Sequence, residues 1–258
     1  TVHTSKGELA GVSAGNVSIF YSVPYGSEPS GSLRYKPPVE HAAWNGTLNV
    51  SSVPDNSMCP QLLLVSRTLF KGSEEHCLTL SVYAPATARP GDGLAVMVWI
   101  PGGAFIEGGQ LAGGLYNGTH LAAAGNVIVV SIQYRVGSLG FLYSPSTAKV
   151  SGNLGLLDQR LGMQWVQREI ASFGGDPAKV TLFGESAGAI SVCAHITAVA
   201  SQGLFRAAIM ESSVCDSTAF FNLPHTAEAY GDAFIEHVGC SGRAGPAATL
   251  TCLQQLPV

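Results

Sequence analysis

The sequence predicts an α/β protein, with a mixed, mostly parallel central sheet flanked by helices and a small β-rich region at its N-terminus. Two patterns carry this prediction. Residues 1–60 alternate short β-like runs with Gly and Pro turns, and from residue 78 onward strand-like and helix-like segments alternate. A hydrophobic content of 46% over 258 residues is enough to fill a large core.

Each element is expected from its own residue pattern. In the N-terminal region the β-like runs are 17–23 and 33–35, the second followed by Pro37-Pro38. Later strands are expected at 78–83, 95–100, 127–134, 180–183 and 207–210, where apolar residues cluster. Apolar residues recur at helical spacing between Gly155 and Gly174, and a further helix is expected over 226–238.

Composition and charge exclude several classes of protein. Charged residues make up 12% of the chain, the net charge is −4 and no basic cluster occurs, which disfavours a nucleic-acid partner. The longest apolar runs, 94–100 and 127–132, are too short to cross a bilayer, so no transmembrane segment is expected. The cysteines lack C-x-x-C spacing, and we expect neither a metal nor a cofactor.

Sequons and cysteines favour a secreted, extracellular protein. Four N-x-S/T sequons are candidate sites for N-linked glycans, at Asn16, Asn45, Asn49 and Asn117. Two cysteine pairs bracket loops and suit local disulfides in an oxidising compartment: Cys59 with Cys77 and Cys240 with Cys252. For Cys193 and Cys215 a bridge and buried free thiols remain equally open.

The segment 179–196 reads as a short apolar strand, a tight turn and a helix. Its turn, Gly184-Glu185-Ser186-Ala187-Gly188, has the G-x-S-x-G pattern of a nucleophile elbow, which exposes a serine hydroxyl at the top of a sheet. The helix that follows directs its free N–H groups at the reacting carbonyl. The pattern alone is common, but its position between a β-run and a helix predicts Ser186 as a nucleophile.

A glycine-rich loop supplies candidate hydrogen-bond donors for an oxyanion. Such a loop should lie between a strand and a helix and precede the serine in the chain. Pro101-Gly102-Gly103-Ala104-Phe105, directly after VMVWI, meets these conditions. The alternative is an ordinary strand-to-loop turn, and the elbow favours the oxyanion loop.

With these motifs the chain resembles the type-B carboxylesterase/cholinesterase family, of the secreted fungal type, over essentially its whole length. The matching segments are LRYKPP (33–38), EEHCLTLSVYAP (74–85), VMVWIPGGAF (96–105), QYRVGSLGF (133–141), the segment 152–189 around the elbow, and MESS (210–213). The resemblance implies an α/β-hydrolase fold and Ser186 as the nucleophile. It implies oxyanion donors at the backbone N–H groups of Gly103, Ala104 and Ala187.

The resemblance also implies structural links. These are the bridges Cys59–Cys77 and Cys240–Cys252, and two buried ion pairs, Arg34 with Glu75 and Arg135 with Asp158. Removing one partner of such a pair would strand a buried charge at a cost of roughly 3–5 kcal/mol.

The chain departs from the family pattern in its oxyanion loop and in one disulfide loop. Pro101 replaces the usual His or Tyr, and Ala104 replaces the third glycine, whose backbone N–H it can still provide. The segment between Cys59 and Cys77 is short and has no tryptophan. Because quaternary ammonium groups need an aromatic face, choline esters are disfavoured, and the short segment favours an open site.

The remaining triad residues are not expected in this chain. The family order is Ser, then Asp or Glu, then His, and 72 residues follow Ser186. His225 and His237 lie too close after the next strand to be the base, and Glu185 and His195 suit supporting or packing roles. Since family chains are about twice this length, residues 1–258 are expected to be the N-terminal part of a single domain, with a β-rich start (1–60) and a core (78–215). A second polypeptide would complete the fold and the triad as a heterodimer.

The predicted function is that of a secreted serine carboxylesterase acting on a small-molecule or lipid ester through an acyl-enzyme on Ser186. The alternatives are a lipase or sterol esterase of the same family and a non-catalytic binding protein with the same fold. Ser186 counts against the binding protein, since members of that branch commonly lack the serine.

Overall fold

The computed structural model describes residues 1–54, 57–63, 68–70, 72, 74, 77–111, 114–215 and 222–258. Within these residues the central sheet has seven strands: β3 (Val12–Ala14), β4 (Val17–Pro24), β8 (Thr79–Pro85), β9 (Leu94–Ile100), β10 (Ile128–Ile132), β13 (Gly175–Glu185) and β14 (Ala207–Glu211). Their order is β14-β13-β9-β10-β8-β4-β3. Pairing is parallel from β10 through β9 and β13 to β14, and antiparallel from β10 through β8 and β4 to β3. The predicted mixed sheet is confirmed.

Shorter strands form three smaller sheets. The first contains β1 (Val2–Thr4), β2 (Gly7–Ala10) and β5 (Thr47–Asn49); the others are the pairs β6 (Gln61–Leu63) with β7 (Thr68–Phe70) and β11 (Tyr143–Ser144) with β12 (Val150–Ser151). The predicted β-rich start therefore contributes both to the central sheet and to a separate small sheet.

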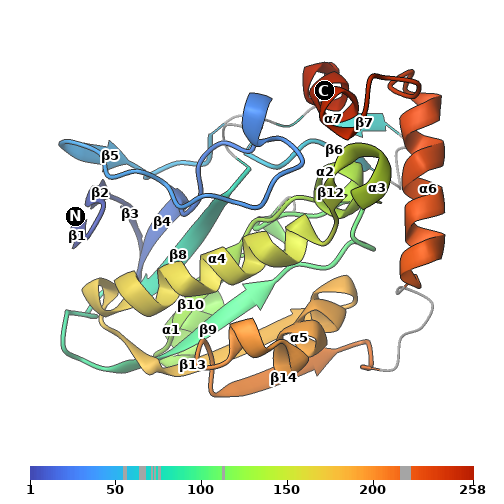
Figure 1. Ribbon diagram of the computed structural model, residues 1–258. Coiled ribbons are helices and arrows are strands. Elements are labelled where there is room, and N and C mark those ends of the chain that lie inside the picture. The colour runs from blue at the N-terminus through green and yellow to red at the C-terminus, as the bar shows by residue number, and fades with distance from the viewer. Residues whose placement is uncertain are drawn as a thin grey trace.

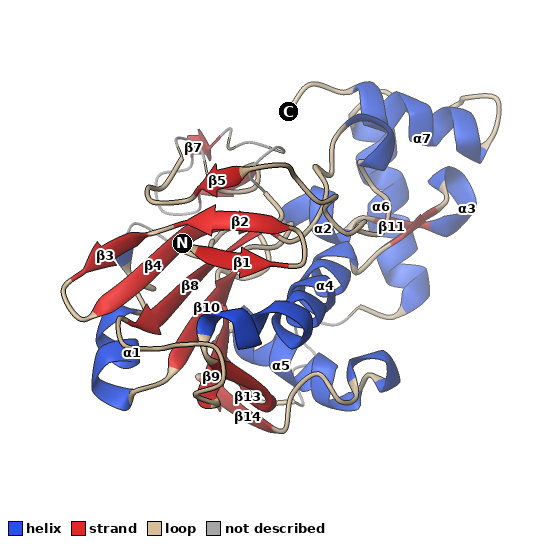
Figure 2. Cartoon of the chain, turned by 90° about the vertical axis from the view of Figure 1, so that its left-hand side faces the viewer, coloured by secondary structure: helices blue, strands red, loops and turns tan. Residues whose placement is uncertain are grey.

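Helices cover both faces of the central sheet. The helices of the described residues are α1 (Thr119–Gly125), α2 (Gly137–Phe141), α3 (Pro145–Ala148), α4 (Leu154–Glu169), α5 (Ala187–Thr197), α6 (Pro224–His237) and α7 (Pro246–Gln255), with 3₁₀ turns η1 (Gly31–Leu33), η3 (Ile170–Phe173) and η4 (Val199–Ser201). Helices α4 and α5 lie in front of the sheet in Figure 1 and α1 lies behind it. The view in Figure 2 shows the same two layers from the side.

The main core lies between the sheet and α4. Val96, Val98 and Ile100 alternate along β9 and share one buried cluster with Met163 and Trp165 of α4. Alternation places these three side chains on the same face of the strand. The apolar spacing that predicted a helix from 155 to 174 is therefore the buried face of α4, which continues into η3 and ends at Gly174 in the left-handed region (φ 91°).

A second, smaller core lies at one end of the sheet, beneath α6 and α7. Leu142, Val150, Ile235, Cys240 and Leu253 are buried there together. Helix α6 packs on β11, and α7 packs on α3. In Figure 1 this unit lies at the upper right, beyond the end of α4.

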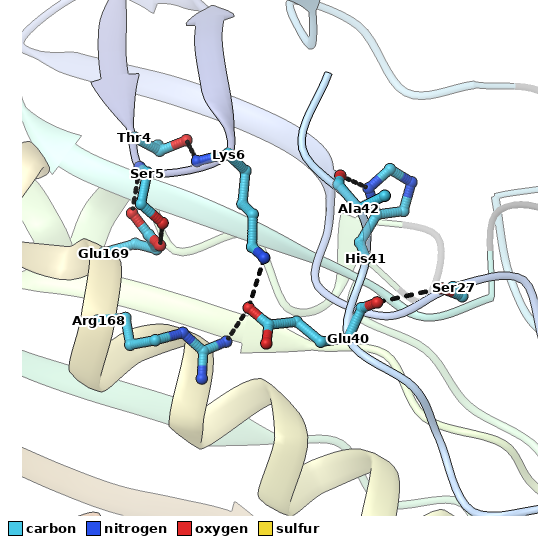
Figure 3. Close-up of polar contacts among 9 residues, drawn as sticks. All are labelled: Thr4, Ser5, Lys6, Ser27, Glu40, His41, Ala42, Arg168 and Glu169. Atoms are coloured by element: carbon cyan, nitrogen blue, oxygen red, sulfur yellow. Dashed lines mark hydrogen bonds and ion pairs between the residues drawn. The ribbon is translucent and has the colours of Figure 1, made fainter.

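Polar contacts tie the β1–β2 turn to the end of α4 (Figure 3). The buried Glu169 carboxylate accepts hydrogen bonds from the Ser5 backbone N–H (2.8 Å) and from its hydroxyl. Beside it, Glu40 forms ion pairs with Lys6 (2.7 Å) and Arg168 (3.0 Å). The N-terminal strands are thus fixed to the same helix that packs on the central sheet.

One predicted β-like run, 33–35, is wrong. The structure has η1 there, followed by turn residues in which Tyr35 has a positive φ of 61°. Arg34 N–H donates back to the Gly31 carbonyl (3.2 Å) and Lys36 N–H to the Leu33 carbonyl (3.1 Å). The backbone satisfies its polar groups locally here, without a strand partner.

The β14 side of the sheet is largely uncovered by the described residues. All five residues of β14 are exposed, and its outer edge pairs with no described strand. Ile209 is 43% and Met210 37% exposed. On the face opposite α4, Met97 and Phe183 are only half-buried. Parallel strands are normally covered on both faces, so this part of the sheet offers an unfinished apolar surface.

Candidate active site

Ser186 lies at the junction between β13 and α5, in a strained backbone conformation. Its φ is 55° and its ψ −120°, a combination that costs free energy for a residue with a side chain. Both flanking glycines are sterically required. A Cβ on Gly188 would lie 2.0 Å from the Ile100 carbonyl oxygen, and one on Gly184 would lie 2.6 Å from the Gly188 carbonyl carbon. The local sequence therefore allows a tight strand-to-helix turn with Ser186 at its apex.

Backbone hydrogen bonds hold this turn in place. The Ser186 N–H donates to the Glu211 carbonyl at the end of β14 (3.0 Å), and the Ser186 carbonyl accepts from Ile190 N–H in the first turn of α5 (3.0 Å). In a trans peptide the N–H points opposite to the C=O. Since the Ser186 carbonyl points into α5, the Ala187 N–H points out of the N-terminal end of the helix.

The loop after β9 orients its N–H groups in the same way. The Gly103 carbonyl accepts hydrogen bonds from the N–H groups of Ile106 and Glu107, each 3.0 Å long. This carbonyl points into the loop, so the Ala104 N–H on the same peptide points out of it. Ala104 and Phe105 take positive φ values of 53° and 60° to close the turn.

The loop and the elbow lie against each other. A Cβ on Gly102 would come within 3.2 Å of Ser186 Cβ and 2.7 Å of the Glu185 carbonyl oxygen. Among the described residues, the N–H groups of Gly103, Ala104 and Ala187 donate no hydrogen bond. Unpaired donors beside a strained serine can bind the negative charge that develops on an acyl carbonyl oxygen.

His195 is a buried packing residue, 4% exposed on α5. Its Nδ1 lies 2.9 Å from Ser201 Oγ and its Nε2 lies 3.0 Å from Gln159 Oε1. Burial, with a smaller contribution from Arg160, lowers the pKa of His195 to about 4. With both ring nitrogens committed, this imidazole is not available to Ser186.

The other described acid and base candidates make no hydrogen bond to the Ser186 hydroxyl. Glu185 Oε2 lies beside Gly102, 3.0 Å from where a Cβ on that glycine would be. His225 and His237 are exposed on α6. In the described part of the chain, no side chain makes a hydrogen bond to Ser186 Oγ.

Three disulfides are present. Cys59–Cys77 and Cys240–Cys252 are the bridges that the resemblance implied, and Cys193–Cys215 answers the question left open for those two cysteines. The third bridge ties α5 to the segment that follows β14. Pairing of cysteines that far apart depends on the fold and could not be read from spacing.

The structure bears differently on the two expected ion pairs. Arg135 and Asp158 form a buried, two-pronged pair with N–O distances of 2.6 and 2.8 Å. Arg34 pairs with Glu74 through two hydrogen bonds of 2.7 and 2.8 Å. The partner expected for Arg34 was Glu75, which lies outside the described residues, so the partner seen in the structure is a correction by one position.

The four sequon asparagines Asn16, Asn45, Asn49 and Asn117 are all exposed. Asn117 Oδ1 accepts a hydrogen bond from Thr119 N–H (2.9 Å), and the turn formed by this bond holds the two ends of the sequon together.

Within the described residues, no group of three or more His, Cys, Asp or Glu side chains is arranged to hold a metal ion. None of the described helices is both long and apolar enough to cross a membrane.

One contributor to the site had no sequence signal of its own. The Gln61 side chain binds Gly108, at the far end of the loop that carries Gly103 and Ala104. The two residues are 47 positions apart. A contact over this separation depends on the fold, so residue type and spacing alone did not indicate it.

Comparisons with known proteins find carboxylic ester hydrolases by sequence. The family model described as "Carboxylesterase family" matches residues 1–258. Among curated proteins, the chain is 44% identical over 222 residues to the cocaine esterase of Oryctolagus cuniculus, covering 83% of this chain and 40% of that protein. It is 44% identical over 217 residues to the para-nitrobenzyl esterase of Bacillus subtilis, covering 82% of this chain and 43% of that protein.

Solved structures give the same result. A thermophilic PNB esterase superposes with a TM-score of 0.85 at 37% identity, covering 99% of this chain and 51% of that one. For a second PNB esterase structure the TM-score is 0.86, and this chain covers 50% of that one. The chain thus spans about two fifths of the curated relatives and half of the solved ones.

Proposed function

This chain belongs to the carboxylesterase family, and we propose that it supplies the nucleophile and the oxyanion donors of a carboxylic ester hydrolase. The observation that carries this proposal is the meeting of two strained loops. One presents Ser186 at the apex of the elbow, and the other presents the unpaired N–H groups of Gly103 and Ala104 beside it. Each loop needs close backbone approach, and together they form a site suited to acyl transfer.

The proposed reaction has two steps. Ser186 Oγ attacks the ester carbonyl while a base takes its proton, and the N–H groups of Gly103, Ala104 and Ala187 bind the oxyanion. Collapse of the tetrahedral intermediate expels the alcohol, which takes up the proton, and leaves an acyl group on Ser186. Water then attacks this acyl-enzyme and releases the carboxylic acid and the free serine.

We assign the base and the acid of the triad to polypeptide outside these 258 residues. The sequence suggested that this polypeptide is a second chain. Three observations support this assignment. The chain spans 40% of the cocaine esterase it matches. No described side chain binds Ser186 Oγ. The edge of β14 and the adjoining face, with Met97, Phe183 and Ile209, are uncovered by described residues. On this proposal, residues 1–258 are the N-terminal part of a single domain that the further polypeptide completes.

The proposed substrate is a small carboxylic ester without a quaternary ammonium group. The relatives named for cocaine and para-nitrobenzyl esters are 44% identical to this chain. An acetylcholinesterase from Electrophorus electricus is 41% identical. However, the segment between Cys59 and Cys77 has no tryptophan to face a quaternary ammonium group.

We further propose that the protein is secreted and glycosylated. The supporting features are three disulfides and four exposed sequon asparagines. Peptide-N-glycosidase treatment of the protein from its native source should lower its apparent mass, and an unchanged mass would contradict glycosylation.

Hydrolysis of p-nitrophenyl butyrate by the complete protein tests the proposed activity. We expect turnover that is abolished in Ser186→Ala and retained in Ser13→Ala, a control at an exposed serine of β3, on the opposite edge of the central sheet from β14. Denaturing mass spectrometry of the same sample tests the second chain. A single species of this chain's mass in an active monomer would contradict it.

A further inference from the structure

We propose that Gln61 is a positioning residue for the oxyanion donors, a role that rests on the proposed function. Gln61 does not line the contact between Ser186 and the loop. It acts through Gly108, which lies at the far end of the segment 102–108.

The Gln61 amide makes three hydrogen bonds, all to backbone. Its Oε1 accepts from Gly108 N–H (2.7 Å), and its Nε2 donates to the carbonyls of Gly108 (3.0 Å) and Cys59 (2.9 Å). The side chain is 5% exposed. It therefore pairs with Gly108 as a neighbouring strand would, using one donor and one acceptor. The Cys59–Cys77 bridge anchors the other side of the contact.

Gly108 in turn supports the peptide that carries the first oxyanion donor. A Cβ on Gly108 would lie 2.3 Å from the Gly102 carbonyl oxygen, so the Gly108 backbone lies directly behind that carbonyl. Its φ of +113° is one that residues with side chains rarely adopt. The Gly102 carbonyl and the Gly103 N–H belong to one rigid peptide plane. A shift of Gly108 therefore turns the Gly103 N–H relative to Ser186.

Only an amide satisfies all three backbone groups at this position. Leucine has a similar shape but would leave the Gly108 N–H and the Cys59 carbonyl without these partners, and the Gly108 carbonyl with only the longer contact from Gln133 Nε2 (3.5 Å). Glutamate keeps the acceptor for Gly108 N–H but would face the carbonyls of Gly108 and Cys59 with a second oxygen. Protonation of that carboxyl restores one donor, so burial beside carbonyls should raise its pKa.

The test compares Gln61→Leu and Gln61→Glu with a matched control in the complete protein. Gln167→Leu is the control because Gln167 Nε2 also donates to two backbone carbonyls, those of Pro177 (2.9 Å) and Leu204 (3.0 Å). We expect kcat for p-nitrophenyl butyrate to fall about 10- to 100-fold in Gln61→Leu with KM within about threefold, because only transition-state contacts are lost. In Gln167→Leu we expect kcat within about twofold at a similar loss of stability.

If Gln61→Leu does not fold, the pH dependence of kcat in Gln61→Glu tests the role of Gln61. The ratio of its kcat to that of the wild type should rise as the pH is lowered, and a flat ratio near one contradicts the proposal. A drop in kcat for Gln167→Leu equal to that for Gln61→Leu also contradicts it, because ordinary destabilisation would then explain both.

Hydrogen exchange of the Gly108 amide separates this proposal from the proposed function. If the wild type neither hydrolyses esters nor reacts at Ser186, the proposed function fails. The positioning of Gly108 by Gln61 is then judged by hydrogen exchange at the Gly108 amide, which should be at least about tenfold faster in Gln61→Leu than in the wild type. Unchanged exchange would show that Gln61 does not hold Gly108 in place.

Discussion

His195 should make the stability of the folded protein depend on pH. Its ring belongs to a buried hydrogen-bonded chain that runs from Ser201 through His195 and Gln159 to Ser191, whose hydroxyl donates to the Ala187 carbonyl (2.9 Å) at the start of the elbow helix. Every group in this chain has a partner when the Ser201 hydroxyl donates to His195 Nδ1 and the His195 Nε2–H donates to Gln159 Oε1. This arrangement needs the neutral imidazole, because a proton on Nδ1 would meet the Ser201 hydroxyl as a second donor.

The size of the effect follows from the pKa of His195 in the folded and unfolded states. Burial lowers this pKa from 6.5 to about 4. The unfolded chain therefore binds more protons between pH 6.5 and pH 4, and the free energy of unfolding falls as the pH is lowered through that window. Each pKa unit corresponds to about 1.4 kcal/mol, so the expected loss is about 2 kcal/mol between pH 7 and pH 5, and about 3 kcal/mol by pH 4.

Urea denaturation of the complete protein at several pH values measures this effect. His195→Gln should lose the contribution, because glutamine keeps a donor and an acceptor without titrating. The control is His237→Gln, which replaces an exposed histidine on α6. The difference in unfolding free energy between wild type and His195→Gln should shift by about 2 kcal/mol from pH 7 to pH 5. A shift no larger than that of the His237→Gln control would refute the reasoning.

Two further substitutions test the elbow and the buried ion pair. Gly188→Ala places a Cβ 2.0 Å from the Ile100 carbonyl oxygen, so the elbow must shift, and kcat should fall at least about 100-fold; kinetics within fivefold of the wild type would contradict the required close approach. The side chains of Arg135 and Asp158 are 2% and 0% exposed, so Asp158→Asn leaves the Arg135 charge buried without its carboxylate. This substitution should lower the free energy of unfolding, measured by urea denaturation, by about 3–5 kcal/mol. A loss below 1 kcal/mol would show that the pair is not needed.

The parts of the site that the sequence predicted are those set by short-range sterics. A turn between a strand and a helix that is too tight for a Cβ at Gly184 or Gly188 leaves a local pattern, and so does a glycine loop after a buried strand. The central sheet was predictable for a similar reason, since its strands are continuous apolar runs. Local patterns of this kind depend on few neighbours.

What the sequence did not predict depends on which segments meet in space. Glu74 and Glu75 are adjacent carboxylates, and which of them reaches Arg34 is decided by the path of the chain rather than by residue type. The bridge Cys193–Cys215 and the contact between Gln61 and Gly108 join segments that only the folded sheet brings together. The run 33–35 has strand-like residues but finds no neighbouring strand, so its backbone closes on itself as a turn.

Covalent labelling of Ser186 tests the central claim most directly. The complete protein is treated with a fluorophosphonate probe, digested and mapped by mass spectrometry, with Ser186→Ala as the control. A site with an activated serine and an oxyanion hole predicts one probe per protein, carried by the peptide that contains Ser186 and absent from the variant. Folded protein that stays unlabelled, or that carries the probe at another serine, would contradict the assignment of Ser186 as the nucleophile.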